Sequence, residues 1–256
     1  MDKKYWIERL EKNEVESMVL LSCLLNDEGI SHLNDSAIEN TLIATYDFGF
    51  VKRGRFYSEN IHESIESIAK WFQENNVELE ATYDNMVMIF NALGIKSYPN
   101  RLYLMKHICN QEKEFKSLLD YEFVNPLIEY KNFLKKGISD FYKLNKNEIN
   151  RLFNSEDFIN DMEKGIYIFK KENVPIGYIM IKYQTNNLAE ISNLWLKKEY
   201  RHKGYSSEII KKIIEIKKKD GRCVIVTVKN DNYGLIRLFE DENFELIKIM
   251  SKEILK

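Results

Sequence analysis

One short segment limits the possible folds of this chain more than any other. The apolar run 191–196 is followed by YRHKGYSS at residues 200–207, and a helix-like run at 209–216 comes next. Gly204 lets the backbone pass close to a ligand, because it has no Cβ. The amides at a helix start are unpaired and carry the positive end of the helix dipole. The segment therefore predicts a strand, a basic turn and a helix that bind a phosphorylated ligand.

The residues on both sides of this segment predict alternating strands and helices. Isoleucines recur at helical spacing in 209–216, with lysines on the other face, whereas 223–228 is a continuous β-rich run. We expect strands at 137–144, 166–169, 176–183, 189–196, 223–228 and 244–249, and helices at 147–153, 155–164, 209–216 and 232–241. The second half is therefore expected to be a mixed α/β sheet with helices on both faces.

The first half has a weaker pattern. It predicts helices at 5–25, 62–74 and 85–93, and strands at 42–51, 77–81 and 102–105. We interpret 52–57 as a basic, aromatic turn and the charged stretch 110–136 as a helical connector. The predicted domains are therefore 1–135 and 136–256, the first either α/β or mostly helical.

The two halves also show a possible internal repeat. A shift of 149 residues pairs Val77 with Val226, Phe90 with Phe239 and Gly94 with Asn243. This echo favours two related halves, although two unrelated strand–helix units could align equally well.

Composition excludes several classes of protein. Lys and Arg number 38 against 40 Asp and Glu, so the charge gives no support for a nucleic-acid partner. Hydrophobic residues make up 44%, enough for a core, yet no run reaches the roughly 20 apolar residues of a membrane span. The N-terminus lacks the pattern of a signal peptide, so we expect a cytoplasmic protein. Scattered cysteines (Cys23, Cys109, Cys223) and histidines (His32, His62, His107) predict neither disulfides nor a metal site.

Two motifs give residues 137–256 a resemblance to the GNAT superfamily of acyl-CoA-dependent N-acetyltransferases. The family's Arg/Gln-x-x-Gly-x-Gly/Ala motif reads RHKGYS at 201–206, after a matching strand exit at 194–200. The family's next motif, a strand, an Asn, a helix with Leu-Tyr and then Gly-Phe, reads 224–228, Asn232, Leu238-Phe239 and Asn243-Phe244. The N-terminal half would be a degenerate copy or a helical cap.

The resemblance implies that acetyl-CoA is the cosubstrate. The amides of the turn would hold its pyrophosphate, the strand backbone would pair with the pantetheine arm, and Asn232 would lie near the pantetheine or the thiol. Asn232 could equally be an ordinary helix N-cap. The implied CoA-binding residues are Leu194, Trp195, Leu196, Arg201, His202, Lys203, Gly204, Tyr205, Ser206, Ser207 and Asn232.

The catalytic groups are less well defined by the sequence. Phe239 stands where many family members have a Tyr that protonates the leaving thiolate, and Phe cannot donate a proton. Thr227 stands where some relatives carry Glu. Glu190, at the start of the central strand, is the candidate general base, although it could be a solvated strand-end charge. A strand amide near Leu196 would stabilise the oxyanion.

The expected activity is acetyl transfer to a primary amine of unidentified type, either a small molecule or a peptide. One alternative is a catalytically weak or inactive acyl-CoA-binding regulatory module. A second is an aminoacyl-tRNA-dependent transferase, which the nearly neutral charge disfavours. The sequence predicts no membrane association and leaves the oligomeric state open.

Overall fold

The computed structural model describes residues 3–26, 41–47, 51–108, 119–123 and 129–255. The chain divides into two compact units, one of residues 1–104 with 248–256 and the other of residues 105–247. The domain boundary predicted at residue 135 lies within α5 (Lys131–Tyr142) and stays a prediction. Cys109 and His32 lie outside the described residues.

The first unit begins with two helices where the sequence pattern predicts one over 5–25. A 3₁₀ turn at Glu11–Asn13 separates them. The helices and strands up to β4, which passes into the second unit, are α1 (Lys3–Leu10), α2 (Glu14–Asn26), β1 (Thr41–Asp47), β2 (Lys52–Ser58), α3 (Ile61–Glu74), β3 (Glu78–Thr82), α4 (Tyr83–Ala92) and β4 (Leu102–His107). This unit is thus an α/β unit and not a helical cap.

Its sheet has the order β1-β2-β3-β10, because β10 (Phe244–Ile254) ends in this unit. β1 and β2 are antiparallel, β2 and β3 are parallel, and β10 is antiparallel to β3. Ile68 and Phe72 of α3 pack with Leu79 of β3 and Ile89 of α4 in one core. Gly54 permits this packing, because a Cβ there would lie 2.7 Å from the Phe72 ring.

The interpretation of residues 52–57 as a turn is wrong, because they form β2. Two of the three basic side chains that suggested a turn pair with carboxylates across the sheet instead. Arg53 lies 2.6 Å from Glu78, and Arg55 lies 2.6 Å from Glu80. β2 forms because it pairs with segments distant in the sequence, and the composition of residues 52–57 alone does not show such pairing.

The second unit contains the remaining elements. They are β5 (Asp120–Phe123), α5, α6 (Lys146–Leu152), α7 (Glu156–Gly165), β6 (Ile166–Lys171), β7 (Val174–Gln184), β8 (Leu188–Leu196), α8 (Tyr205–Lys219), β9 (Cys223–Lys229) and α9 (Tyr233–Asp241). The ends of α6 and α7 follow from capping, since Asn145 and Ser155 accept hydrogen bonds from the first turn of each helix.

Two predictions fail here. The predicted strand at 137–144 belongs to α5, whose buried Leu134 and Ile138 lie one helical turn apart. Gly137 allows α5 to approach the sheet, because a Cβ would meet the rings of Tyr178 and Trp195 at 2.5 and 2.9 Å. The predicted connector at 110–136 contains β5, which pairs antiparallel with β6.

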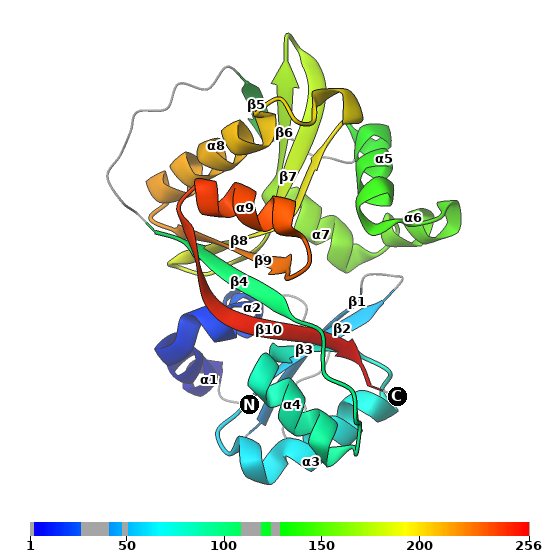
Figure 1. The fold of residues 1–256 in the computed structure, drawn as a ribbon, viewed down its shortest axis with the longest axis vertical. Coiled ribbons are helices and arrows are strands. Elements are labelled where there is room, and N and C mark those ends of the chain that lie inside the picture. Colours follow the sequence, from blue (N-terminus) through cyan, green and yellow to red (C-terminus); the bar gives the residue numbers. More distant parts are fainter. Residues whose placement is uncertain (1–2, 27–40, 48–50, 109–118, 124–128, 256) are drawn as a thin grey trace. The chain divides into compact units, whose positions relative to one another are not determined.

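The sheet of the second unit has the order β9-β8-β7-β6-β5, with only the β8–β9 pair parallel. Tyr178 and Trp195 face α5, and alternation along the strands turns Ile179 and Leu194 to the opposite face. Figure 1 shows α5 and α8 on opposite sides of these strands. The mixed α/β sheet predicted for this part of the chain is confirmed.

The predicted repeat is matched by local structure. Gly94 and Asn243, paired by the 149-residue shift, both have positive φ, 69° and 61°. Each follows a helix, and their amides donate to Asn91 at 3.1 Å and to Glu240 at 3.0 Å, two residues that the same shift pairs. The strand–helix order β3-α4 in the first unit is repeated by β9-α9 in the second.

Candidate active site

The parallel strands β8 and β9 pair only over their first halves. The register joins Leu188–Ile191 to Cys223–Val226, whereas β8 runs on to Leu196 and β9 to Lys229. β8 also skips a partner at Ser192, because Met180 pairs with Asn193 and Ile181 with Ile191. Such a bulge bends a strand. The carboxyl ends of β8 and β9 therefore lie apart, and their facing backbone groups do not pair with each other.

The turn after β8 leads directly into α8 at this end of the sheet. Its backbone is left-handed at His202, with φ of 58°, and at Gly204, with φ of 83°. The first backbone bond of α8 is donated by Glu208 to Gly204 at 3.2 Å. The amides of Tyr205, Ser206 and Ser207 precede that bond, and a helix offers such amides no carbonyl. The predicted anion site thus has the expected backbone geometry.

The side chains of the turn have different roles. Arg201 donates through Nε to the carbonyl of Leu196 at 2.9 Å, which ties the turn to the end of β8. The Ser207 hydroxyl donates to Glu242, so this side chain joins α8 to the end of α9. Lys203 is exposed and lies over the Tyr200 ring. The backbone of 202–207 is therefore better placed to bind an anion than most of its side chains.

Lys171 is a further cation beside the turn. It ends β6, and its Nζ donates to the Tyr205 hydroxyl at 2.8 Å. That hydrogen bond, with the nearby phenol, raises the pKa of Lys171 above its usual value, so the ammonium is charged at neutral pH. The sequence separates Lys171 from Tyr205 by 34 residues, which is why the motif alone did not identify it.

Glu190 is buried, not solvated. Only 7% of its surface is exposed, and its Oε1 accepts a hydrogen bond from the Thr227 hydroxyl at 3.0 Å. Ile191 and Val226 are register partners, so Glu190 and Thr227 lie on the same face of the sheet, just where the strands stop pairing. This arrangement places a carboxylate beside the point of divergence.

The three strand residues predicted to bind the pantetheine arm lie beyond that point. Leu194, Trp195 and Leu196 pair with β7 along one edge of β8, through Ile179, Tyr178 and Gly177. The Trp195 ring is stacked on Tyr178 at 5.8 Å and is buried under α5. A ligand at the other edge of β8 would therefore meet Trp195 through its backbone and not through its indole.

Asn232 and Phe239 of the second motif both make structural contacts, and a CoA-binding role for Asn232 stays a prediction. Asn232 caps α9, because its Oδ1 accepts from the Leu235 amide at 3.2 Å. Phe239 is 1% exposed and packs edge-on against Phe244 at 4.9 Å. The residue that replaces the usual Tyr is therefore part of the core.

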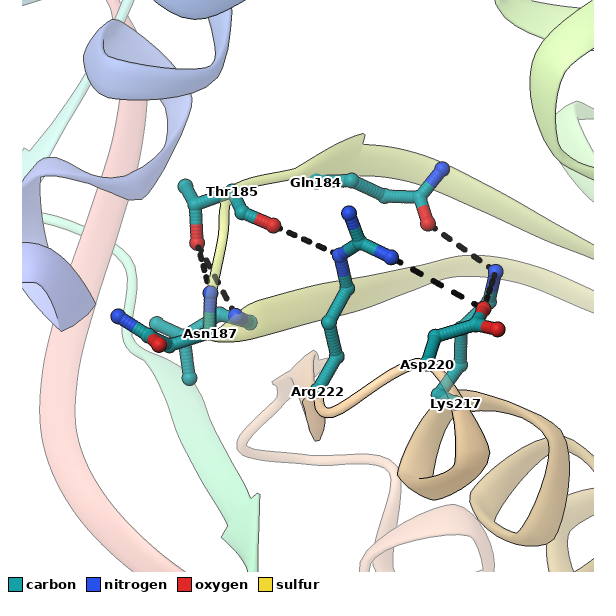
Figure 2. Close-up of polar contacts among 7 residues, drawn as sticks. Gln184, Thr185, Asn187, Lys217, Asp220 and Arg222 are labelled. Atoms are coloured by element: carbon teal, nitrogen blue, oxygen red, sulfur yellow. Dashed lines mark hydrogen bonds and ion pairs between the residues drawn. The ribbon is translucent and has the colours of Figure 1, made fainter.

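A polar cluster fixes the opposite end of the β8–β9 pair (Figure 2). Arg222, just before β9, donates to the Thr185 carbonyl at 2.7 Å, and the Cys223 amide donates to Asn187 at 2.8 Å. The buried Lys217 of α8 donates to Gln184 at 3.0 Å and lies 3.4 Å from Asp220. These bonds hold the β7–β8 turn to the end of α8. They set the register of β8 against β9, and therefore where the strands diverge.

The part of the chain that carries the site matches a known family. The family model of the GNAT acetyltransferases matches residues 135–244. This match covers the turn, both diverging strands and α8 and α9, so this part of the chain is a GNAT acetyltransferase domain. No curated protein matches the sequence.

Solved structures resemble nearly the whole chain. A GCN5-related N-acetyltransferase from Kribbella flavida has a TM-score of 0.58 at 12% identity, covering 92% of this chain and 94% of its own. A GNAT-family protein described as a putative acetyltransferase, from Novosphingobium aromaticivorans, has a TM-score of 0.57 at 13% identity, with 93% and 96% covered. A tandem GNAT protein from the clavulanic acid biosynthesis pathway has a TM-score of 0.54 at 10% identity, with 99% and 95% covered. At these identities the similarity is one of fold.

Two other features are absent from the described residues. No group of three or more His, Cys, Asp or Glu side chains there is arranged to hold a metal ion. No helix in the same residues combines the length and apolarity that crossing a membrane requires.

Proposed function

We propose that this chain is an N-acetyltransferase that uses acetyl-CoA to acetylate a primary amine. The divergence of β8 and β9 beside the start of α8 carries the proposal. The amides at 202–207 would bind the CoA pyrophosphate, and the open edge of β8 would pair with the pantetheine arm. The family match of residues 135–244 supports the same acyl donor.

Glu190 is the group that we assign as general base. The amine must lose a proton as its nitrogen attacks the thioester carbon, and a carboxylate can take that proton directly or through one water. The C–N bond forms, the C–S bond breaks, and the thiolate takes a proton from water, since Phe239 has none to give. The amide near Leu196 would stabilise the oxyanion of the tetrahedral intermediate.

A turnover assay tests this function. Purified protein would be given acetyl-CoA and a panel of polyamines, aminoglycosides, free lysine and short peptides, and released thiol and acetylated amine would both be quantified. We expect one product per thiol released, and Glu190→Gln should lower kcat by about 100-fold while calorimetry shows unchanged acetyl-CoA affinity.

Three outcomes would count against the proposal in different ways. Tight acetyl-CoA binding without transfer to any amine would favour the acyl-CoA-binding module. No binding of acetyl-CoA at all would refute the assigned CoA site. Binding of tRNA at low salt would support the transferase alternative, whose salt dependence could then be measured.

A further inference from the structure

The Thr227 hydroxyl spans the two diverging strands. It lies on β9 one residue beyond Val226, the last residue of β9 in register with β8. Its hydrogen bond to Glu190 therefore joins the strands next to the point where backbone pairing ends. A side-chain bond at this place can help fix the orientation of a group beside the point of divergence.

The carboxylate that it contacts needs a fixed orientation. Glu190 is buried, and a buried carboxylate is stabilised only where donors satisfy its oxygens. A hydroxyl that donates to Oε1 also restricts the rotation of the carboxylate. Thr is branched at Cβ, which limits its own rotamers and gives the hydroxyl a defined position.

Strand formation alone does not account for a Thr here. Its neighbours Val224, Ile225, Val226 and Val228 are all apolar and buried. A Val at 227 would have nearly the same shape and an equal tendency to form a strand. The hydroxyl is therefore the property that distinguishes this position from the rest of β9.

We infer that Thr227 is a positioning residue that holds the Glu190 carboxylate in the orientation needed to accept the amine proton. The inference rests on the proposed function, because it requires Glu190 to be the base. Thr227 itself touches neither substrate in this mechanism. It acts on kcat through Glu190 and not on the binding of acetyl-CoA.

A double-mutant cycle tests this coupling. Thr227→Val, Thr227→Ser, Glu190→Gln and the Thr227→Val/Glu190→Gln pair would be assayed with acetyl-CoA and the best amine of the panel. We expect Thr227→Val to lower kcat about tenfold or more, with the KM for acetyl-CoA changed less than about twofold. Thr227→Ser should recover most of that loss. In the Glu190→Gln background, Thr227→Val should have no further effect.

Ser139→Ala is the matched control. The Ser139 hydroxyl is on α5, outside the diverging strands, and it donates to the Leu144 carbonyl at 2.8 Å. We expect little change in kcat from its removal. The inference is overturned if Thr227→Val keeps full kcat, or if Thr227→Val and Thr227→Ser lose kcat equally. It is also overturned if the double variant loses kcat by the product of the two single-variant factors. If the wild-type protein binds acetyl-CoA but acetylates no amine, the proposed function is refuted and this inference with it. If acetyl transfer depends on Glu190 but does not change in the Thr227 variants, only the inference is refuted.

Discussion

Glu80 is a buried carboxylate whose charge depends on Arg55. Burial alone would raise the pKa of Glu80, but the positive charges of Arg55, Arg53 and Lys252 outweigh it and lower the pKa below its usual 4.5. The Arg55–Glu80 side chains are each 10% exposed, whereas those of the Arg53–Glu78 pair are 19% and 17% exposed. The two pairs therefore allow a matched comparison.

Glu80→Gln should destabilise the protein strongly, because it leaves the Arg55 guanidinium buried without its counter-charge. We expect a loss of about 3–5 kcal/mol in the free energy of unfolding by urea, and a smaller loss for Glu78→Gln. The apolar pair Arg55→Met/Glu80→Leu should restore most of the stability. Equal losses for the two Gln variants would contradict this view of the buried pair.

The same pair predicts a pH dependence. A carboxyl whose pKa is lower in the folded state contributes stability above its unfolded pKa, and that contribution is lost as the pH falls through the folded pKa. The stability gap between wild type and Glu80→Gln should thus be full near neutral pH and shrink below about pH 4.5. A gap that stays constant from pH 7 to pH 3 would show that the ion pair contributes nothing.

Among the elements, α8 is held at its C-terminal end and begins at the turn that we propose binds CoA. Lys217, near the C-terminal end of α8, is 4% exposed, and Gly204 is the residue just before the helix starts. Lys217→Met keeps the apolar stem and removes the hydrogen bond to Gln184, so we expect a loss of about 1–3 kcal/mol by urea unfolding. Lys219→Met is the control, because its side chain is 73% exposed and its pair with Glu215 is a surface one. Similar losses for both variants would argue against a structural role for Lys217.

The sequence pattern predicted most elements of the second unit, since β6 to β10 and α6 to α9 follow from periodicity. It failed where a tertiary contact decides the structure. Gly137 suits a helix only because α5 packs on Tyr178 and Trp195, and β5 is a strand only because β6 pairs with it. Local pattern carries no information about either partner.

The same limit applies to the candidate site. The turn at 201–207 comes from a contiguous motif and the base candidate Glu190 from its place at the start of a strand, and both roles stay predictions. Thr227 as a donor to Glu190, and Lys171 beside Tyr205, depend on strand register and on a hairpin 34 residues away. Only the folded chain brings these pairs together.

Across the whole chain, the two units have similar elements but different ligand-binding features. In the first unit, α3 is preceded by Asn60, with φ of -125°, whereas α8 is preceded by Gly204, with φ of 83°. The Arg55–Glu80 pair also bridges β2 and β3 just beyond Gly54 and Leu79, the last residues in register. The start of α3 thus lacks the left-handed glycine that leads into α8. We therefore expect each chain to bind one acetyl-CoA, in the second unit.

Calorimetric titration of acetyl-CoA into the wild type, Gly204→Glu and Gly221→Glu would show whether the turn before α8 is the CoA site. Both glycines have positive φ, 83° and 75°, and open space where a Cβ would lie, so both variants carry the same strain at opposite ends of α8. We expect one site per chain, no binding by folded Gly204→Glu, and wild-type affinity for Gly221→Glu. Unchanged affinity in folded Gly204→Glu, or two sites per chain, would refute this assignment.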